Sequence, residues 1–125
     1  MRQLNVLLVE DDDSARALYS YMLAAAGYNV KAVSNGLEAL TEIDVNRPDV
    51  ILTDILMPIL NGLDLITIVR ANNDISDLPI VVITSFREGL REQARAAGAT
   101  DVIDKSTEMA RVREVIEAAV SRPRL

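Results

Sequence analysis

The chain of 125 residues contains no cysteine, no histidine and no tryptophan, and it has one phenylalanine and three tyrosines. Without cysteine it can form neither disulfides nor thiolate metal sites. Without histidine it has no imidazole ligand, no Ser-His-Asp triad and no histidine general base. These absences exclude several large classes of enzymes and predict a core of aliphatic side chains.

The sequence also lacks an excess of basic residues and a long apolar run. Its 13 Lys and Arg against 19 Asp and Glu give a formal net charge of -6, which argues against direct binding to nucleic acid. No apolar run reaches the roughly 18 residues that cross a bilayer, and the N-terminus does not resemble a signal peptide. We therefore expect no membrane insertion and a cytoplasmic location.

The length and the 50% apolar content predict one packed domain over residues 1–120, followed by a tail or the start of a linker at 121–125. Residues 6–9, 50–53 and 80–84 are aliphatic runs almost without alternation, as in strands covered on both faces. Residues 29–33 and 101–103 mix polar and apolar side chains, which is typical of edge strands.

Helical repeats lie between these strands. They are Ala15, Leu18, Met22 and Ala26; Leu37, Leu40 and Ile43; and Met109, Val112, Ile116 and Val120. We expect Ser14, Asn35 and Asn61 to begin helices, and Gly27 and Gly98 to follow them. The alternation of strands and helices predicts an α/β fold, a flavodoxin-like doubly wound five-stranded parallel sheet in the order 2-1-3-4-5, with five helices on both faces.

In such sheets ligands bind beyond the carboxyl ends of the strands, at the switch point between the first and third strands. Glu10 and Asp11 follow the first strand and Asp54 follows the third. Convergent carboxylates raise one another's pKa, and oxygen ligands alone favour a hard cation, Mg²⁺ or Mn²⁺. A solvated acidic turn is the alternative interpretation.

Two further positions at that end of the sheet suit an anion. Thr84 and Ser85 end the fourth strand and Lys105 follows the fifth, so a hydroxyl and a cation would lie beside the carboxylates. Each is common as a helix cap or a surface lysine. The chain has no glycine-rich nucleotide signature. Together the residues favour phosphoryl transfer to an aspartate, in which positioning and counter-charge do most of the catalysis.

This arrangement resembles the receiver domain of two-component response regulators, from Leu4 to about Val120. The resemblance rests on Glu10-Asp11, on Asp54-Ile55-Leu56-Met57-Pro58 with Gly62, on Thr84-Ser85 and on Lys105, in this order. It implies a module of signal transduction, chemotaxis-type or cut from a longer regulator. Such a module is not a conventional enzyme, although it catalyses its own phosphorylation and dephosphorylation.

The resemblance also implies roles for individual residues. Asp54 would be the phosphoacceptor, and Mg²⁺ would bind Asp11, Asp54, the Leu56 carbonyl and, through water, Glu10. Thr84 would donate to the phosphoryl group and Lys105 would pair with it. The donor would be a sensor histidine kinase or a histidine phosphotransfer protein, and the output would be binding to an unknown partner protein.

The sequence departs from the family pattern at several positions. Val102 stands at the switch position, where the family usually has an aromatic residue. Ser106 replaces the usual proline, which predicts a trans bond from Lys105 and a possible cap for the last helix. The loop of Ile55, Leu56, Ile59 and Leu60 is aliphatic, which suits either a docking patch or local packing.

Access to the phosphoryl site is predicted to be apolar. Leu56 and Phe86, next to Ser85, would flank the site, and neither has a polar group to orient an attacking water, so we expect slow self-dephosphorylation. Phe86 could also substitute for the missing aromatic switch or simply pack under a helix. Two other functions are considered: a phosphorylation-independent pseudo-receiver scaffold, and a Mg²⁺-dependent phosphohydrolase, which Leu56 disfavours because an aspartate is expected there.

Overall fold

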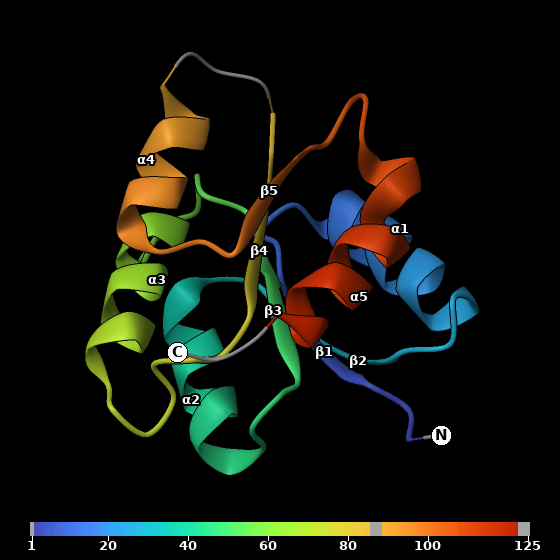
Figure 1. Ribbon diagram of the computed structural model, residues 1–125. Helices are drawn as coiled ribbons and strands as arrows, with labels where there is room; N and C mark the ends of the chain where they lie inside the picture. Colours follow the sequence, from blue (N-terminus) through green and yellow to red (C-terminus); the bar gives the residue numbers. More distant parts are fainter. Residues whose placement is uncertain (1, 86–88, 123–125) are drawn as a thin grey trace.

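The computed structural model describes residues 2–85 and 89–122, which form a parallel sheet between two layers of helices (Figure 1). The strands are β1 (Asn5–Val9), β2 (Asn29–Val33), β3 (Val50–Thr53), β4 (Ile80–Thr84) and β5 (Asp101–Asp104). They lie in the order β2-β1-β3-β4-β5, and every neighbouring pair is parallel. The predicted order, with β2 and β5 at the edges, is confirmed.

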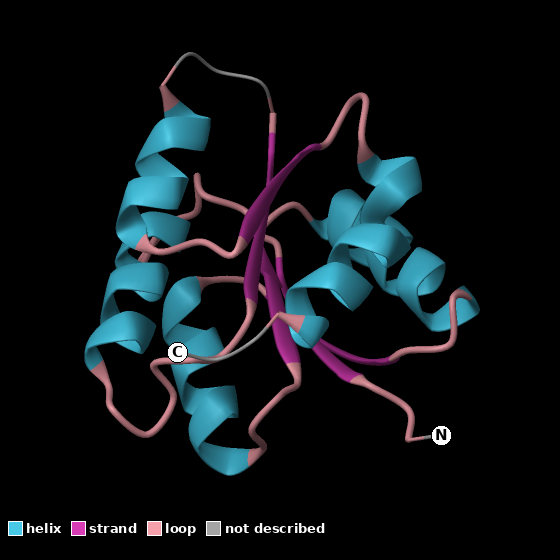
Figure 2. Cartoon of the chain, in the orientation of Figure 1, coloured by secondary structure: helices cyan, strands magenta, loops and turns pink. Residues whose placement is uncertain are grey.

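The helices divide between the two faces of the sheet. They are α1 (Asp13–Ala25), α2 (Gly36–Val45), α3 (Gly62–Ala71), α4 (Leu90–Ala97) and α5 (Val112–Ser121), and a short 3-10 turn, Met109–Arg111, precedes α5. Figures 1 and 2 show α1 and α5 on one face and α2, α3 and α4 on the other. The chain is therefore doubly wound, as predicted, and both faces of the sheet are covered.

The core consists of two clusters separated by the sheet. Val6 and Leu8 of β1 belong to the cluster under α1 and α5, whereas Leu7 and Val9 belong to the cluster under α2, α3 and α4. Side chains along a strand alternate between its faces, so a strand covered on both sides must be apolar throughout. This explains why the three central strands show almost no alternation in the sequence.

Side chains define where the helices begin. Asn35 Oδ1 accepts from the Glu38 amide and Asn61 Oδ1 accepts from the Asp64 amide, both at 2.9 Å, so these two predicted caps are confirmed. The prediction for Ser14 is wrong, because Asp12 caps α1 and its carboxylate accepts from Ala15 N at 2.7 Å. The helix therefore begins at Asp13.

Two predicted helical faces are correct except at one residue each: Ala15, Met22 and Ala26 of the first and Leu40 and Ile43 of the second pack against the core. Leu18 and Leu37 are both 55% exposed, although the sequence placed them on buried faces. On α1 the buried residues are Tyr19 and Leu23, one turn apart. A face centred on these larger side chains turns Leu18 toward solvent, because successive helical residues are about 100° apart.

The segment after β5 differs from one prediction and agrees with another. The described residues contain no cis peptide bond, so the bond from Lys105 to Ser106 is trans, as expected. Ser106 does not cap α5: it donates from Oγ to Asp104 Oδ1 at 2.7 Å, and α5 begins only at Val112.

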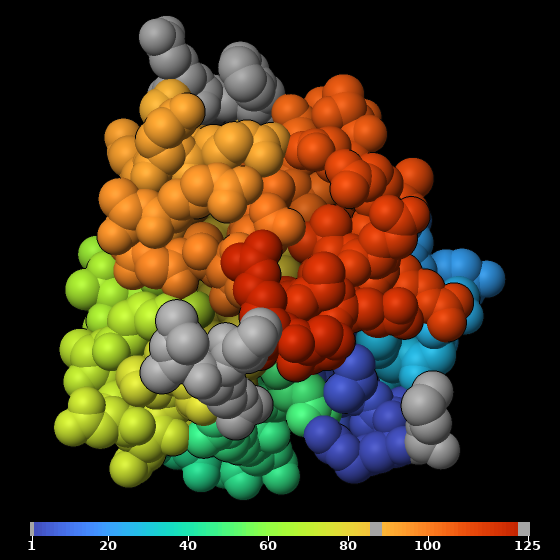
Figure 3. Space-filling view, viewed as in Figure 1, coloured from blue at the N-terminus to red at the C-terminus, as the bar shows by residue number. Residues whose placement is uncertain are grey.

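Figure 3 shows the face of the molecule that α4 (orange) and α5 (red) form. No described helix is long and apolar enough to span a membrane.

Candidate functional site

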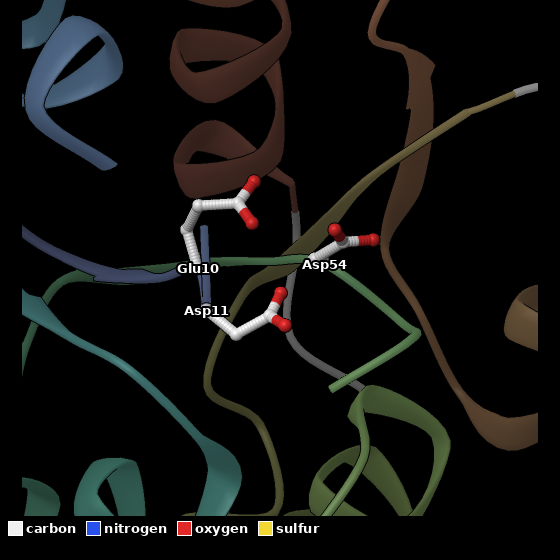
Figure 4. Close-up of side chains that lie close together, drawn as sticks. All are labelled: Glu10, Asp11 and Asp54. Atoms are coloured by element: carbon white, nitrogen blue, oxygen red, sulfur yellow. The ribbon is translucent and has the colours of Figure 1, made fainter. Parts of the chain in front are cut away.

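Three carboxylates meet at the carboxyl ends of β1 and β3. Glu10 and Asp11 directly follow β1, and Asp54 directly follows β3. These two strands are neighbours with Val9 opposite Thr53, so the residues that follow them emerge side by side. One oxygen of each of the three lies within 4.8 Å of the others, and Figure 4 shows the carboxylates turned toward a common space. The structure thus brings together the acidic residues that the sequence singled out.

Glu10 is the most deeply buried of the three. Its side chain is 1% exposed, and its Oε2 accepts from the Asp12 amide at 3.2 Å. Burial raises the pKa of Glu10, an effect that hydrogen bonds from Lys105 and the Asp12 amide only partly offset. Such a carboxylate gains strongly from a nearby positive charge, because burial removes the water that would otherwise solvate it.

Lys105 supplies that charge from the end of β5. Its Nζ donates to Glu10 Oε1 at 2.6 Å and to Asp54 Oδ2 at 2.7 Å, and its side chain is 19% exposed. Burial acts to lower the pKa of Lys105, but the hydrogen bonds to Asp54 and Glu10 outweigh it and raise the pKa above its ordinary value. The lysine therefore stays charged and links the two carboxylates.

The backbone fixes the position of Asp54. The amide of Ile55 donates to Asp54 Oδ1 at 2.7 Å, and the amide of Gly62, at the start of α3, donates to the Ile55 carbonyl at 2.8 Å. A Cβ added at Gly62 would lie 2.1 Å from the Asp54 carbonyl oxygen. Only glycine permits so close an approach of α3 to the aspartate.

Tyr19 is a neighbour of the site that the sequence reasoning missed. Its ring centroid lies 5.9 Å from Lys105 Nζ, and its side chain is buried in the core between the sheet and α1. Burial raises the pKa of Tyr19, and the charges of Glu10 and Asp54 raise it further against the effect of Lys105. The sequence does hold a sign that Tyr19 faces the core: it lies four residues from Ala15 and four from Leu23, which is the spacing of one helical face.

Of the remaining predicted residues, Thr84 ends β4, Ser85 directly follows it, and Val102 lies in β5. Thr84 is buried at the end of β4, its carbonyl accepts from the Lys105 amide at 3.0 Å, and Ser85 after it is exposed. Val102 is 4% exposed and belongs to the core cluster under α4. Phe86 lies outside the described residues, so its suggested part in access to the site stays a prediction.

The aliphatic loop after Asp54 is partly core and partly surface. Ile55 is 1% exposed, whereas Leu56 and Ile59 are 48% and 74% exposed. Ile59 has a φ of 71°, the one positive φ of a non-glycine residue in the described part of the chain. That conformation is uncommon for a β-branched residue, and it accompanies a tight turn in which the Leu60 amide donates to the Pro58 carbonyl at 2.8 Å.

The donor set suits one kind of metal ion. Carboxylate and carbonyl oxygens without imidazole or thiolate are the ligands that Mg²⁺ and Mn²⁺ prefer. The three carboxylates carry more negative charge than Lys105 alone neutralises, and one of them, Glu10, is almost fully buried. The residues present therefore fit a hard divalent cation.

A doubly wound α/β sheet with an acidic cluster and a lysine at its carboxyl end is the arrangement typical of a receiver-type signalling domain. The chain belongs to the response regulator receiver domain family, and the sequence model of that family matches residues 6–117. Receiver domains act in two-component signalling and interact with histidine kinases. They are generally signalling modules rather than enzymes.

Individual relatives support the same conclusion. The chain is 38% identical over 104 residues to the response regulator MprA of Mycobacterium sp. (strain KMS), covering 82% of the chain and 44% of that protein. It is 31% identical over 115 residues to the polar-differentiation response regulator DivK of Brucella anthropi, covering 91% of the chain and 94% of DivK. It thus spans less than half the length of MprA and nearly all of DivK.

A solved structure is similar over its whole length. The receiver domain of a sensor histidine kinase from Pseudomonas aeruginosa, described with a magnesium ion coordinated in the active site cleft, superposes with a TM-score of 0.88. The sequences are 28% identical, and the match covers 97% of this chain and 100% of that one.

Proposed function

We propose that Asp54 is the phosphoacceptor of a two-component or phosphorelay system, and that its phosphorylation controls binding to an output protein. The observation that carries the proposal is the grouping of Asp54 with Glu10 and Asp11 within 4.8 Å, with Lys105 Nζ 2.7 Å from Asp54. A carboxylate nucleophile, a cation site and a fixed ammonium are what phosphoryl transfer to an aspartate requires.

The proposed cofactor is Mg²⁺, for which Mn²⁺ can substitute. Asp11 and Asp54 would bind it directly, Glu10 through a water molecule, and the carbonyl oxygen of Leu56 would complete the share of the protein. When bound, the cation neutralises negative charge on the carboxylates and on the incoming phosphoryl group. The magnesium ion described in the related receiver domain from Pseudomonas aeruginosa supports this assignment.

The residues of the chain divide the remaining work. A carboxylate oxygen of Asp54 forms a bond to phosphorus while the phosphorus–nitrogen bond of a phosphohistidine donor breaks, and the donor imidazole keeps the electron pair. Lys105 pairs with the phosphoryl oxygens and the Thr84 hydroxyl donates to one of them. The donor is a sensor histidine kinase or a histidine phosphotransfer protein.

Incubation with Mg²⁺ and acetyl phosphate tests the proposal. We expect intact mass spectrometry to show the addition of one phosphoryl group that is stable in acid and lost in base. Asp54→Asn should abolish it, whereas Asp44→Asn, a change at an exposed carboxylate of α2, should leave it intact. A wild-type chain that gains no such group would instead be a phosphorylation-independent scaffold.

The cytoplasmic location and the division at residue 120 stay predictions.

A further inference from the structure

Lys105 contacts an aromatic ring as well as the two carboxylates. The ring of Tyr19 comes from α1, far from β5 in the sequence, and its centroid lies 5.9 Å from Lys105 Nζ. Tyr19 is 9% exposed as a whole residue, and the Lys105 side chain is 19% exposed. A cation within about 6 Å of a ring centroid is attracted to the negative face of the ring, most strongly where water is excluded.

A contact of this kind restricts a side chain that is otherwise flexible. A lysine head is a point charge on four methylene groups, and it loses much rotational freedom when it is held in one place. In the structure, ion pairs with Glu10 and Asp54 hold it. In the proposed reaction these carboxylates also take part in binding the cation and the phosphoryl group, so the ion pairs that hold Lys105 must change.

The ring of Tyr19 takes no part in binding the proposed cation or the phosphoryl group. Its attraction for an ammonium depends on neither metal nor phosphoryl binding, and Tyr19 belongs to the buried core cluster under α1 and α5. The contact of the ring with Lys105 therefore does not depend on the anions that pair with the lysine.

We propose that Tyr19 is a positioning residue that keeps the Lys105 ammonium beside Asp54 through the face of its ring. The part of this inference that concerns catalysis rests on the proposed function. The contact itself is independent of that function, so it is tested separately.

Three variants separate the ring from the volume it fills. Tyr19→Phe keeps the ring, Tyr19→Leu removes it, and Tyr28→Leu removes a buried tyrosine of the same core cluster at the opposite end of the sheet. Proton NMR of the metal-free protein tests the contact. We expect the Lys105 ε-methylene protons to be shifted upfield by the ring in the wild type and in Tyr19→Phe, and to lose that shift in Tyr19→Leu.

The rate of phosphorylation by acetyl phosphate in Mg²⁺ tests the role. We expect Tyr19→Phe and Tyr28→Leu to stay within about twofold of the wild type, and Tyr19→Leu to be slower by about 3- to 10-fold. In a Lys105→Met background, Tyr19→Leu should cause no further loss, because the ring acts only through the lysine. Thermal unfolding shows which variants are folded at the assay temperature.

Three results would overturn the inference: an unshifted ε-methylene in the wild type, a Tyr19→Phe variant as slow as Tyr19→Leu, or an equal effect of Tyr19→Leu with and without Lys105. If Tyr19→Leu fails to fold, the contrast between the wild type and Tyr19→Phe still decides whether the hydroxyl rather than the ring matters. A wild type that takes no phosphoryl group refutes the proposed function, and the NMR result then stands alone for the contact.

Discussion

Lys105 sets the electrostatic balance of the site at the level of single residues. A carboxylate as buried as Glu10 would lose most of its hydration free energy without compensation, a cost of several kcal/mol. The ammonium at 2.6 Å partly offsets that cost and at the same time lies 2.7 Å from Asp54. One cation thus serves the buried acid and the proposed nucleophile together.

If Asp54 is phosphorylated as proposed, we expect Leu56 to slow the attack of water on the phosphoryl group. The side chain is 48% exposed and offers no hydrogen bond to an attacking water. We expect Leu56→Asn to shorten the lifetime of the phosphorylated protein several-fold, because an amide can orient the water toward phosphorus. The measurement is the decay of the phosphorylated fraction by mass spectrometry after the phosphodonor is removed.

A control on the same loop is Ile59→Asn, which adds the same amide to a residue that is 74% exposed. This variant should leave the lifetime unchanged. It should also increase stability slightly, because asparagine tolerates a positive φ better than isoleucine does. A lifetime unaffected by Leu56→Asn would show that access of water is limited elsewhere.

At the level of elements, Asp49 ties the beginnings of two adjacent strands together. Its carboxylate accepts from the Asn5 amide at 2.7 Å and from Arg2, and its own amide donates to the Asn5 carbonyl at 2.8 Å. Asn5 begins β1 and Asp49 directly precedes β3. These contacts fix the register of the strands that carry Glu10 and Asp54 at their other ends.

The stability that Asp49 contributes should depend on pH. Burial acts to raise the pKa of Asp49, but hydrogen bonds from Arg2 and the Asn5 amide outweigh it and lower the pKa. A lowered pKa in the folded state means that the contribution is complete above the unfolded pKa of about 3.9 and is lost as the pH falls through the folded value.

We therefore expect Asp49→Asn to lower the free energy of unfolding by about 1 kcal/mol at pH 6, and the difference from the wild type to shrink toward pH 2. Urea unfolding at both pH values measures it. Asp44→Asn, at an exposed position of α2, should stay within about 0.5 kcal/mol of the wild type at either pH. A difference that stays constant with pH would contradict the assignment.

The arrangement of the whole molecule explains why the site lies where it does. The two core clusters hold the sheet from both sides and leave the carboxyl ends of the strands free of helices. The residues that follow β1, β3, β4 and β5 therefore gather at the carboxyl end of the sheet, although 95 positions separate Glu10 from Lys105. A cation bound there would couple to the folding of the entire domain.

Magnesium should accordingly stabilise the whole protein by mass action. At a concentration ten times its dissociation constant, Mg²⁺ should raise the free energy of unfolding of the wild type by about 1.4 kcal/mol. Asp11→Ala should be stabilised less, because it removes an exposed carboxylate that belongs to the cluster. Thermal unfolding across a magnesium titration measures both proteins.

The matched control is Asp13→Ala, which removes a neighbouring exposed carboxylate whose partner is Arg16 rather than the cluster. It should respond to magnesium as the wild type does. Equal stabilisation of Asp11→Ala and the wild type would remove Asp11 from the set of proposed ligands.

The sequence alone determined the topology and the set of polar residues at the carboxyl end of the sheet. Aliphatic runs without alternation identified the three central strands, because only strands covered on both faces are apolar throughout. The order of elements then put Glu10, Asp11, Asp54, Thr84 and Lys105 at one end of a parallel sheet. These features follow from local patterns and from rules of chain connection, so they need no knowledge of packing.

The tertiary structure alone decided which side chains meet. Local spacing did not show that Tyr19 rather than Leu18 faces the core, or that its ring lies beside Lys105, because the rotation of a helix depends on the surface it packs against. Likewise, Ser106 suits a helix cap by residue type, but the Asp104 carboxylate accepts its hydroxyl before the helix begins. Contacts between distant residues are set by packing of the entire chain, which no short stretch of sequence contains.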